Sequence, residues 1–78
     1  MKRITVLLAD DHIIVREGFR QMLELEADLR VVGEAADGRQ AVALAVKLRP
    51  EVVLMDIAMP RLNGLEATRQ VLEALPSA

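Results

Sequence analysis

Residues 4–11 read ITVLLADD, a short apolar run that two aspartates close. A run that is apolar throughout and rich in β-branched residues is typical of a strand buried on both faces of a parallel sheet. The same pattern returns at residues 52–56, VVLMD, and predicts a strand over Val52–Met55. Between them, RVVGEA predicts a further strand over Arg30–Ala35. The first segment, Ile4–Ala9, thus sets a pattern that the chain repeats.

Apolar residues at helical spacing predict a helix after each strand. The first helix carries its apolar side at Val15, Phe19, Met22 and Leu23, and we expect its charged side, facing solvent, at Arg16, Glu17, Arg20 and Glu24. The second carries Ala41, Leu44, Ala45 and Leu48, and stops near Arg49 because Pro50 follows. The third carries Leu65, Thr68, Leu72 and Leu75, and ends at Pro76.

Strands that alternate with helices predict an α/β fold, with a parallel sheet, right-handed crossovers and helices covering the sheet. Three strands are few for this class of fold. The strand over residues 52–55 has the composition of an interior strand, so its outer edge could lack a partner. An unprotected apolar edge favours pairing with another chain. We therefore expect either a fragment of a larger domain or an oligomer.

Composition excludes several classes of protein. The 78 residues suffice for one small domain or part of one. The absence of cysteine rules out a disulfide scaffold and a thiolate zinc site. A net charge of −2 and a single aromatic residue, Phe19, argue against binding of nucleic acid through a basic patch or stacking platform. No apolar run approaches membrane-spanning length, and we expect a cytoplasmic protein without a membrane partner.

Aspartates follow two of the predicted strands: Asp10 and Asp11 after the first, and Asp56 after the third. If those strands are neighbours, three carboxylates meet at one edge of the sheet, where open α/β sheets bind ligands. Their mutual repulsion favours a hard divalent cation, and Mg²⁺ prefers oxygen ligands beside a phosphate. The alternative is that Asp10 or Asp11 caps a helix. We expect the adjacent His12 to be a solvated surface residue and Asn63-Gly64 to be only a turn.

Other phosphate-binding machinery is missing from the sequence. The first strand-helix turn, ADDHI, has no glycine, which excludes a dinucleotide site there. The chain contains neither a G-x-x-x-x-G-K-[ST] loop nor a G-x-S-x-G elbow. We therefore exclude dinucleotide-dependent oxidoreductases, P-loop enzymes and α/β-hydrolases.

Three segments together resemble a bacterial response-regulator receiver domain. They are LLADDH at residues 7–12, GEAADG at residues 33–38 and VLMDIAMPRLNG at residues 53–64. The first two are similar to those of the NarL/FixJ (LuxR-type) transcription regulators in particular. The likeness covers the whole chain. It implies a flavodoxin-like (CheY-like), three-layer α/β/α fold, whose full sheet has five parallel strands in the order 2-1-3-4-5.

The resemblance also implies roles for particular residues. Asp56 would accept a phosphoryl group from a sensor histidine kinase. Mg²⁺ would be held by Asp10, Asp11, Asp56 and the backbone carbonyl of Ala58. The cation would neutralise phosphoryl charge, so that a carboxylate can attack an already anionic group. The protein would be a phosphoacceptor that assists its own modification in the control of transcription, and not a turnover enzyme.

The chain departs from the family pattern at its end. We expect residues 1–78 to be the N-terminal part of a receiver domain, with three strand-helix units, truncated before the fourth strand. The hydroxyl residue expected after the fourth strand and the lysine expected after the fifth have no counterpart. We expect no effector DNA-binding domain within residues 1–78, so any DNA contact would be made through a domain outside them. We expect weak Mg²⁺ binding and poor phosphoryl acceptance.

Two other functions stay open. The chain could be a structural piece that self-associates through the edge of residues 52–55 or through the third helix, as a dimer or a domain-swapped dimer. It could also be a Mg²⁺-dependent phosphatase that forms an aspartyl phosphate. Such enzymes usually need a second acid two residues after the nucleophile, and this position is Ala58.

Overall fold

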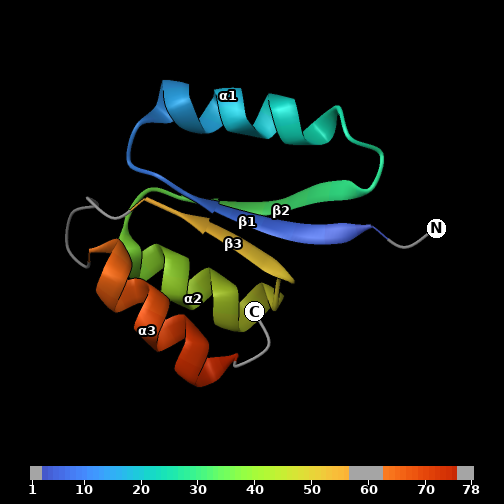
Figure 1. The fold of residues 1–78 in the computed structure, drawn as a ribbon. Helices are drawn as coiled ribbons and strands as arrows, with labels where there is room; N and C mark the ends of the chain where they lie inside the picture. Colours follow the sequence, from blue (N-terminus) through green and yellow to red (C-terminus); the bar gives the residue numbers. More distant parts are fainter. Residues whose placement is uncertain (1–2, 57–62, 76–78) are drawn as a thin grey trace.

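The computed structural model describes residues 3–56 and 63–75. Strands and helices alternate along the chain as the sequence predicts (Figure 1). The elements are β1 (Ile4–Ala9), α1 (Ile13–Glu24), β2 (Leu29–Ala35), α2 (Gly38–Leu48), β3 (Val52–Met55) and α3 (Gly64–Ala74). The predicted bounds of β1 and β3 are confirmed, and β2 begins one residue earlier than expected.

The three strands form one parallel sheet in the order β2-β1-β3. Ala9, the last residue of β1, is aligned with Ala35 on β2 and with Met55 on β3. All three strands therefore end at the same edge of the sheet. The prediction that the first and third strands are neighbours is confirmed, as is a flavodoxin-like arrangement of three strand-helix units.

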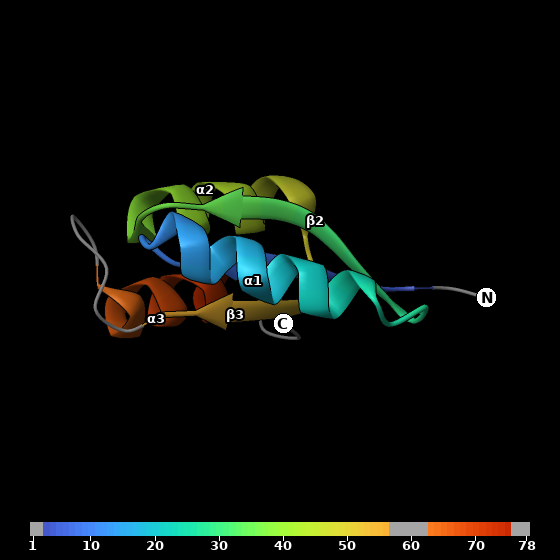
Figure 2. The ribbon, with the colours of Figure 1, turned by 90° about the horizontal axis from the view of Figure 1, so that it is seen from above.

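The helices make the outer layers of a three-layer structure. Helix α1 covers one face of the sheet, and α2 and α3 cover the other (Figure 1). Figure 2 shows α1 lying over the middle of the sheet, between β2 and β3. The core lies on the side of α2 and α3, where Leu7 of β1 packs with Ala45, Val71 and Leu75. In the part of the chain that the structure describes, no helix is long and apolar enough to cross a bilayer.

The inward side of α1 is displaced from the predicted one, although Leu23 is half-buried as expected. No residue of α1 is buried, and Val15 and Phe19 are each 45% exposed. Arg16, which we assigned to the solvent side, is instead one of the less exposed residues of the helix, because its side chain reaches Glu34 on β2. An ion pair thus fills part of the space that apolar side chains were expected to fill.

The predicted face of α3 is also displaced. Its buried residues are Gly64, Ala67 and Val71, whereas Leu65 and Leu72 are exposed. Small residues on the buried side allow α3 to lie close to α2, with which it packs. Leu65 and Leu72 therefore lie on the outer side of the helix, whereas Leu75, at its end, is buried in the core as predicted.

The helix ends follow ordinary capping chemistry. The Asp37 side chain accepts a hydrogen bond from the backbone N–H of Gln40 and so caps α2. Asn63 caps α3 in the same way, so that Asn63-Gly64 is a helix start as well as a turn. Helix α2 stops before Pro50 as expected, with Arg49 in the left-handed conformation at φ 48°.

Strand β3 lies at an edge of the sheet within the described residues, although its apolar composition is that of an interior strand. Its Val52 and Leu54 side chains are 39% and 41% exposed. Among the described residues, β3 pairs with β1 along one edge only.

Candidate metal centre

Strand ends bring the predicted acidic residues together. The backbone N–H of Asp10 donates to the carbonyl of Ala35 at 3.0 Å, which extends the β1-β2 pairing by one residue. The backbone N–H of Asp56 donates to the carbonyl of Ala9 at 2.9 Å, which does the same for β3. Asp10 and Asp56 therefore leave neighbouring strands at the same level, at the edge where parallel sheets bind ligands.

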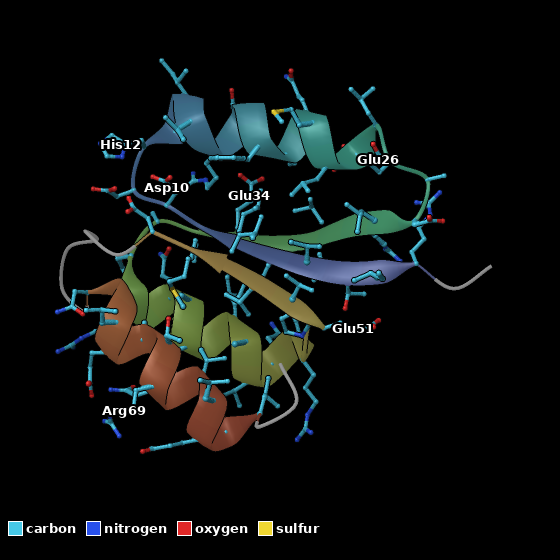
Figure 3. The ribbon with its side chains drawn as sticks, viewed as in Figure 1. Asp10, His12, Glu26, Glu34, Glu51 and Arg69 are labelled. Carbon is cyan, nitrogen blue, oxygen red and sulfur yellow. The ribbon has the colours of Figure 1, made fainter. Side chains whose placement is uncertain are left out.

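The side chains of Asp10, Asp11 and Asp56 converge there with His12. One ligand atom from each of these four residues lies within 4.8 Å of the others. The Asp10 and Asp11 side chains are only 16% and 30% exposed. Figure 3 shows Asp10 and His12 beside each other where α1 begins. We call these four residues the acidic cluster. Ala58, the fourth predicted ligand, lies outside the described residues.

His12 lies on the solvent side of the acidic cluster. Its Nδ1 lies 3.1 Å from Asp10 Oδ1 and 3.0 Å from Asp11 Oδ1. The hydrogen bond to Asp10 and then the charge of Asp11 raise the pKa of His12 above its usual value. The side chain is 67% exposed, as expected, but it is not an isolated surface group. It supplies a titratable positive charge that partly balances the carboxylates.

Helix capping does not account for the aspartates. Helix α1 begins at Ile13, its N-cap residue is His12, and no side chain provides the capping hydrogen bond. Asp10 Oδ1 accepts from the backbone N–H of His12 at 2.9 Å, in a turn that precedes the helix. Neither Asp10 nor Asp11 is therefore the N-cap of α1, and the capping alternative is wrong.

A groove of about 370 Å³ runs from the acidic cluster between α1 and β3. Its described lining is apolar apart from one end and comprises Leu8, Ala9, Asp10, Arg16, Phe19, Leu54, Met55 and Asp56. The cluster thus combines hard oxygen donors with an open approach. Carboxylate oxygens are the ligands that Mg²⁺ prefers, so the donor set fits this ion.

Sequence reasoning missed Arg16 and Glu34. Arg16 Nε donates to Glu34 Oε1 at 3.0 Å, and its Nη1 donates to the backbone carbonyl of Asp10 at 2.8 Å. Glu34 lies between α1 and the sheet (Figure 3). A charged residue inside the apolar run VVGEA was the available indication, because a half-buried glutamate requires a cationic partner.

Comparison with known proteins agrees with this geometry. Residues 6–77 match the family model of the response regulator receiver domain. The chain is 50% identical over 72 residues to the transcriptional regulatory protein LiaR of Bacillus subtilis, covering 92% of this chain and 34% of LiaR. It spans about a third of the length of the curated relatives it matches.

Solved structures give the same result. The response regulator domain of Thermotoga maritima CheB superposes with a TM-score of 0.94 at 39% identity, over 97% of this chain and 57% of that one. A LuxR-family response regulator from Aurantimonas superposes with a TM-score of 0.92, also at 39% identity, over 99% of this chain and 55% of that one. The chain therefore belongs to the response regulator receiver family, and its relatives are transcription regulators of the LuxR/NarL type.

Proposed function

We propose that Asp56 accepts a phosphoryl group from a sensor histidine kinase, with Mg²⁺ held by Asp10, Asp11, Asp56 and the backbone carbonyl of Ala58. The observation that carries this proposal is the convergence of three carboxylates within 4.8 Å at the carboxyl edge of the sheet. Receiver domains generally use Mg²⁺ at an acidic pocket. The three carboxylates and the open groove beside them supply the donor set and the access that such a site needs.

The transfer needs a nucleophile, an orientation and charge compensation. A carboxylate oxygen of Asp56 attacks phosphorus, and an O–P bond forms as the bond from phosphorus to the donor nitrogen breaks. The electron pair stays on that nitrogen, which takes up a proton. When bound, Mg²⁺ offsets the negative charge of the phosphoryl oxygens. Asp10 and Asp11 neutralise no phosphoryl charge themselves, so their role is to hold the cation beside Asp56.

The product is a modified protein and not a released compound, so the proposed role is that of a signalling module without turnover. We assign residues 1–78 to the N-terminal part of a receiver domain. Control of transcription would be exerted by a DNA-binding effector domain that these residues do not include. The proposed donor is a cytoplasmic kinase domain, and we propose that the protein acts in the cytoplasm.

We further propose that the 78-residue chain, by itself, accepts the phosphoryl group slowly. The described lining of the groove includes one cation, Arg16, and no lysine, serine or threonine. Arg16 is engaged with Glu34 and with backbone carbonyls. Stabilisation of the transferring group would therefore depend on the cation site more than on side-chain donors.

Incubation with a small phosphodonor and Mg²⁺, followed by intact mass and peptide mapping, tests the proposal. We expect slow addition of one phosphoryl group at Asp56, lost when Mg²⁺ is chelated and absent in Asp56→Asn. The control variant Asp28→Asn removes the same charge from an exposed site and should be labelled like the parent. Labelling that survives in Asp56→Asn would contradict the acceptor role, and rapid stoichiometric labelling would contradict the slow rate.

Self-association through the β3 edge or α3 is the second candidate function. Leu54 on β3 and Phe19 on α1 line the same groove and are 41% and 45% exposed. Burying such an apolar edge against a second copy of the chain would remove it from water. Sedimentation velocity across a range of concentrations should then show a dimer, and Leu54→Lys should shift it toward monomer. A folded chain that remains monomeric throughout excludes this candidate.

A further inference from the structure

Arg16 is the polar residue that ties α1 to the acidic edge of the sheet. Its side chain is only 15% exposed, whereas most residues of α1 are exposed. Nε donates to Glu34 Oε1 at 3.0 Å. Nη1 donates to the backbone carbonyl of Asp10 at 2.8 Å and to that of Ala35 at 3.4 Å. One guanidinium therefore contacts the ends of both β1 and β2.

These contacts fix the backbone from which two carboxylates project. The N–H of Asp10 is already held by the carbonyl of Ala35. The carbonyl of Asp10, held by Arg16, belongs to the planar peptide that joins Asp10 to Asp11. Rotation of that peptide would redirect both side chains, because each Cα–Cβ bond is set by the backbone on either side of it. Glu34 in turn fixes the guanidinium.

We propose that Arg16 is a positioning residue: it locks the Asp10-Asp11 peptide so that both carboxylates face Asp56. Its consequence for metal affinity rests on the proposed function, whereas the ordering of the peptide does not. Side chains that orient metal ligands without touching the metal commonly change affinity by about 10–100-fold when they are replaced. The proposal extends the site from the strand ends to the first helix.

The sign of the effect separates positioning from simple electrostatics. Arg16 lines the same groove as Asp10 and Asp56, so removing its positive charge makes the site more negative. If charge alone mattered, neutralising Arg16 would strengthen binding of a divalent cation. If Arg16 positions the ligands, the same change weakens binding. Glu34 offsets the charge of Arg16, which keeps the purely electrostatic gain small.

Arg20 provides a matched control on the same helix. Its Nε lies 3.7 Å from Glu34 Oε2, and its side chain is 44% exposed. Arg20→Gln thus removes the same charge beside the same glutamate, while the hydrogen bond from Arg16 to Asp10 stays. Arg16→Gln removes that bond. Arg16→Lys keeps the charge but replaces the planar fork with one ammonium group, which cannot hold Glu34 and both carbonyls in the same way.

The experiment has two readouts on the 78-residue chain: Mg²⁺ affinity, and NMR relaxation with amide exchange at Asp11 and His12 without metal. We expect Arg16→Gln to weaken Mg²⁺ binding by about 10-fold or more. We also expect it to increase motion and exchange at those two amides. Arg20→Gln should leave the amides unchanged and the affinity equal or slightly higher. Arg16→Lys should fall between Arg16→Gln and the parent, and it replaces Arg16→Gln if that variant does not fold.

Tighter Mg²⁺ binding by Arg16→Gln, or amides at Asp11 and His12 as ordered as in Arg20→Gln, would overturn the proposal. An Arg16→Lys variant identical to the parent in both readouts would overturn it as well. If the parent chain binds no Mg²⁺, the proposed metal site fails. The metal-free amide measurements then still decide whether Arg16 positions the peptide.

Discussion

Replacing Asp56 by Asn should reverse the order of stability between variant and parent when Mg²⁺ is added. Asn has nearly the same shape as Asp but carries no charge. Without metal, the variant loses the repulsion that Asp56 experiences from Asp10 and Asp11 within the 4.8 Å cluster. With metal, it loses a ligand. The free energy of unfolding of Asp56→Asn should therefore be larger than that of the parent without metal. With Mg²⁺ it should be smaller than that of the parent.

The distances set the size of both effects. Two like charges 4.8 Å apart repel by about 0.9 kcal/mol in water, and by more where solvent is partly excluded. Two such pairs, offset by the charge of His12, give a net gain of about 1 kcal/mol for metal-free Asp56→Asn. Mg²⁺ at one hundred times its dissociation constant should stabilise the parent by about 2.7 kcal/mol. The variant should show little of this stabilisation.

Urea unfolding followed by circular dichroism, at constant ionic strength with and without Mg²⁺, measures both quantities. Asp28→Asn is the control, because its exposed side chain lies before β2, at the opposite end of the strands. That variant should gain the same Mg²⁺ stabilisation as the parent. If Asp56→Asn also gained it, Asp56 would not be a ligand. If Asp56→Asn were unfolded without metal, the carboxylate would have a structural role and the reasoning from charge repulsion would be refuted.

Four further outcomes are expected. Gly18→Ala should stabilise the chain by about 0.5–1 kcal/mol, because a Cβ there meets nothing within 4 Å in the middle of α1. Gly33→Ala should cost about 1 kcal/mol, because its Cβ would lie 3.2 Å from Cδ1 of the buried Leu7, whereas the contact at 2.8 Å is with Cδ1 of the partly exposed Leu48, which can shift. Urea unfolding measures both changes. The pKa of His12, measured by NMR titration, should lie above 6.5 and should fall in Asp10→Asn. Because the pKa is raised in the folded state, the stability that His12 contributes is fully present below pH 6.5. It is lost as the pH rises through the folded-state pKa. Asp37→Ala should cost about 1 kcal/mol in the same unfolding assay by removing the cap of α2, and an unchanged midpoint would contradict that role.

The sheet and the acidic edge could be predicted because buried parallel strands leave continuous apolar runs in the sequence. ITVLLA and VVLM each end at an aspartate, so strand adjacency alone brings those carboxylates together. No knowledge of side-chain packing was needed. Ala58 lies outside the described residues, and its role stays a prediction.

The buried faces of the helices were harder to predict, because some inward positions hold small or charged residues and not large apolar ones. In α3 the buried positions include the small residues Gly64 and Ala67, whereas Leu65 and Leu72 are exposed. In α1, Arg16 faces the sheet because it pairs with Glu34. Glu34 is eighteen residues away in the sequence, so the pattern of the helix gives no sign of this partner. Neither helical periodicity nor composition contains that long-range pairing. The contact between Arg16 and the Asp10 carbonyl could be found only from the structure.

The central claim is that Asp10, Asp11 and Asp56 bind one divalent cation together. Substoichiometric Mn²⁺, added to the ¹⁵N-labelled chain, broadens the amide signals nearest its binding site. The account predicts that the signals of Asp10, Asp11 and Asp56 are lost first and recover when excess Mg²⁺ is added. Persistence of those three signals, with broadening at other acidic residues such as Glu24 and Glu26, would contradict it.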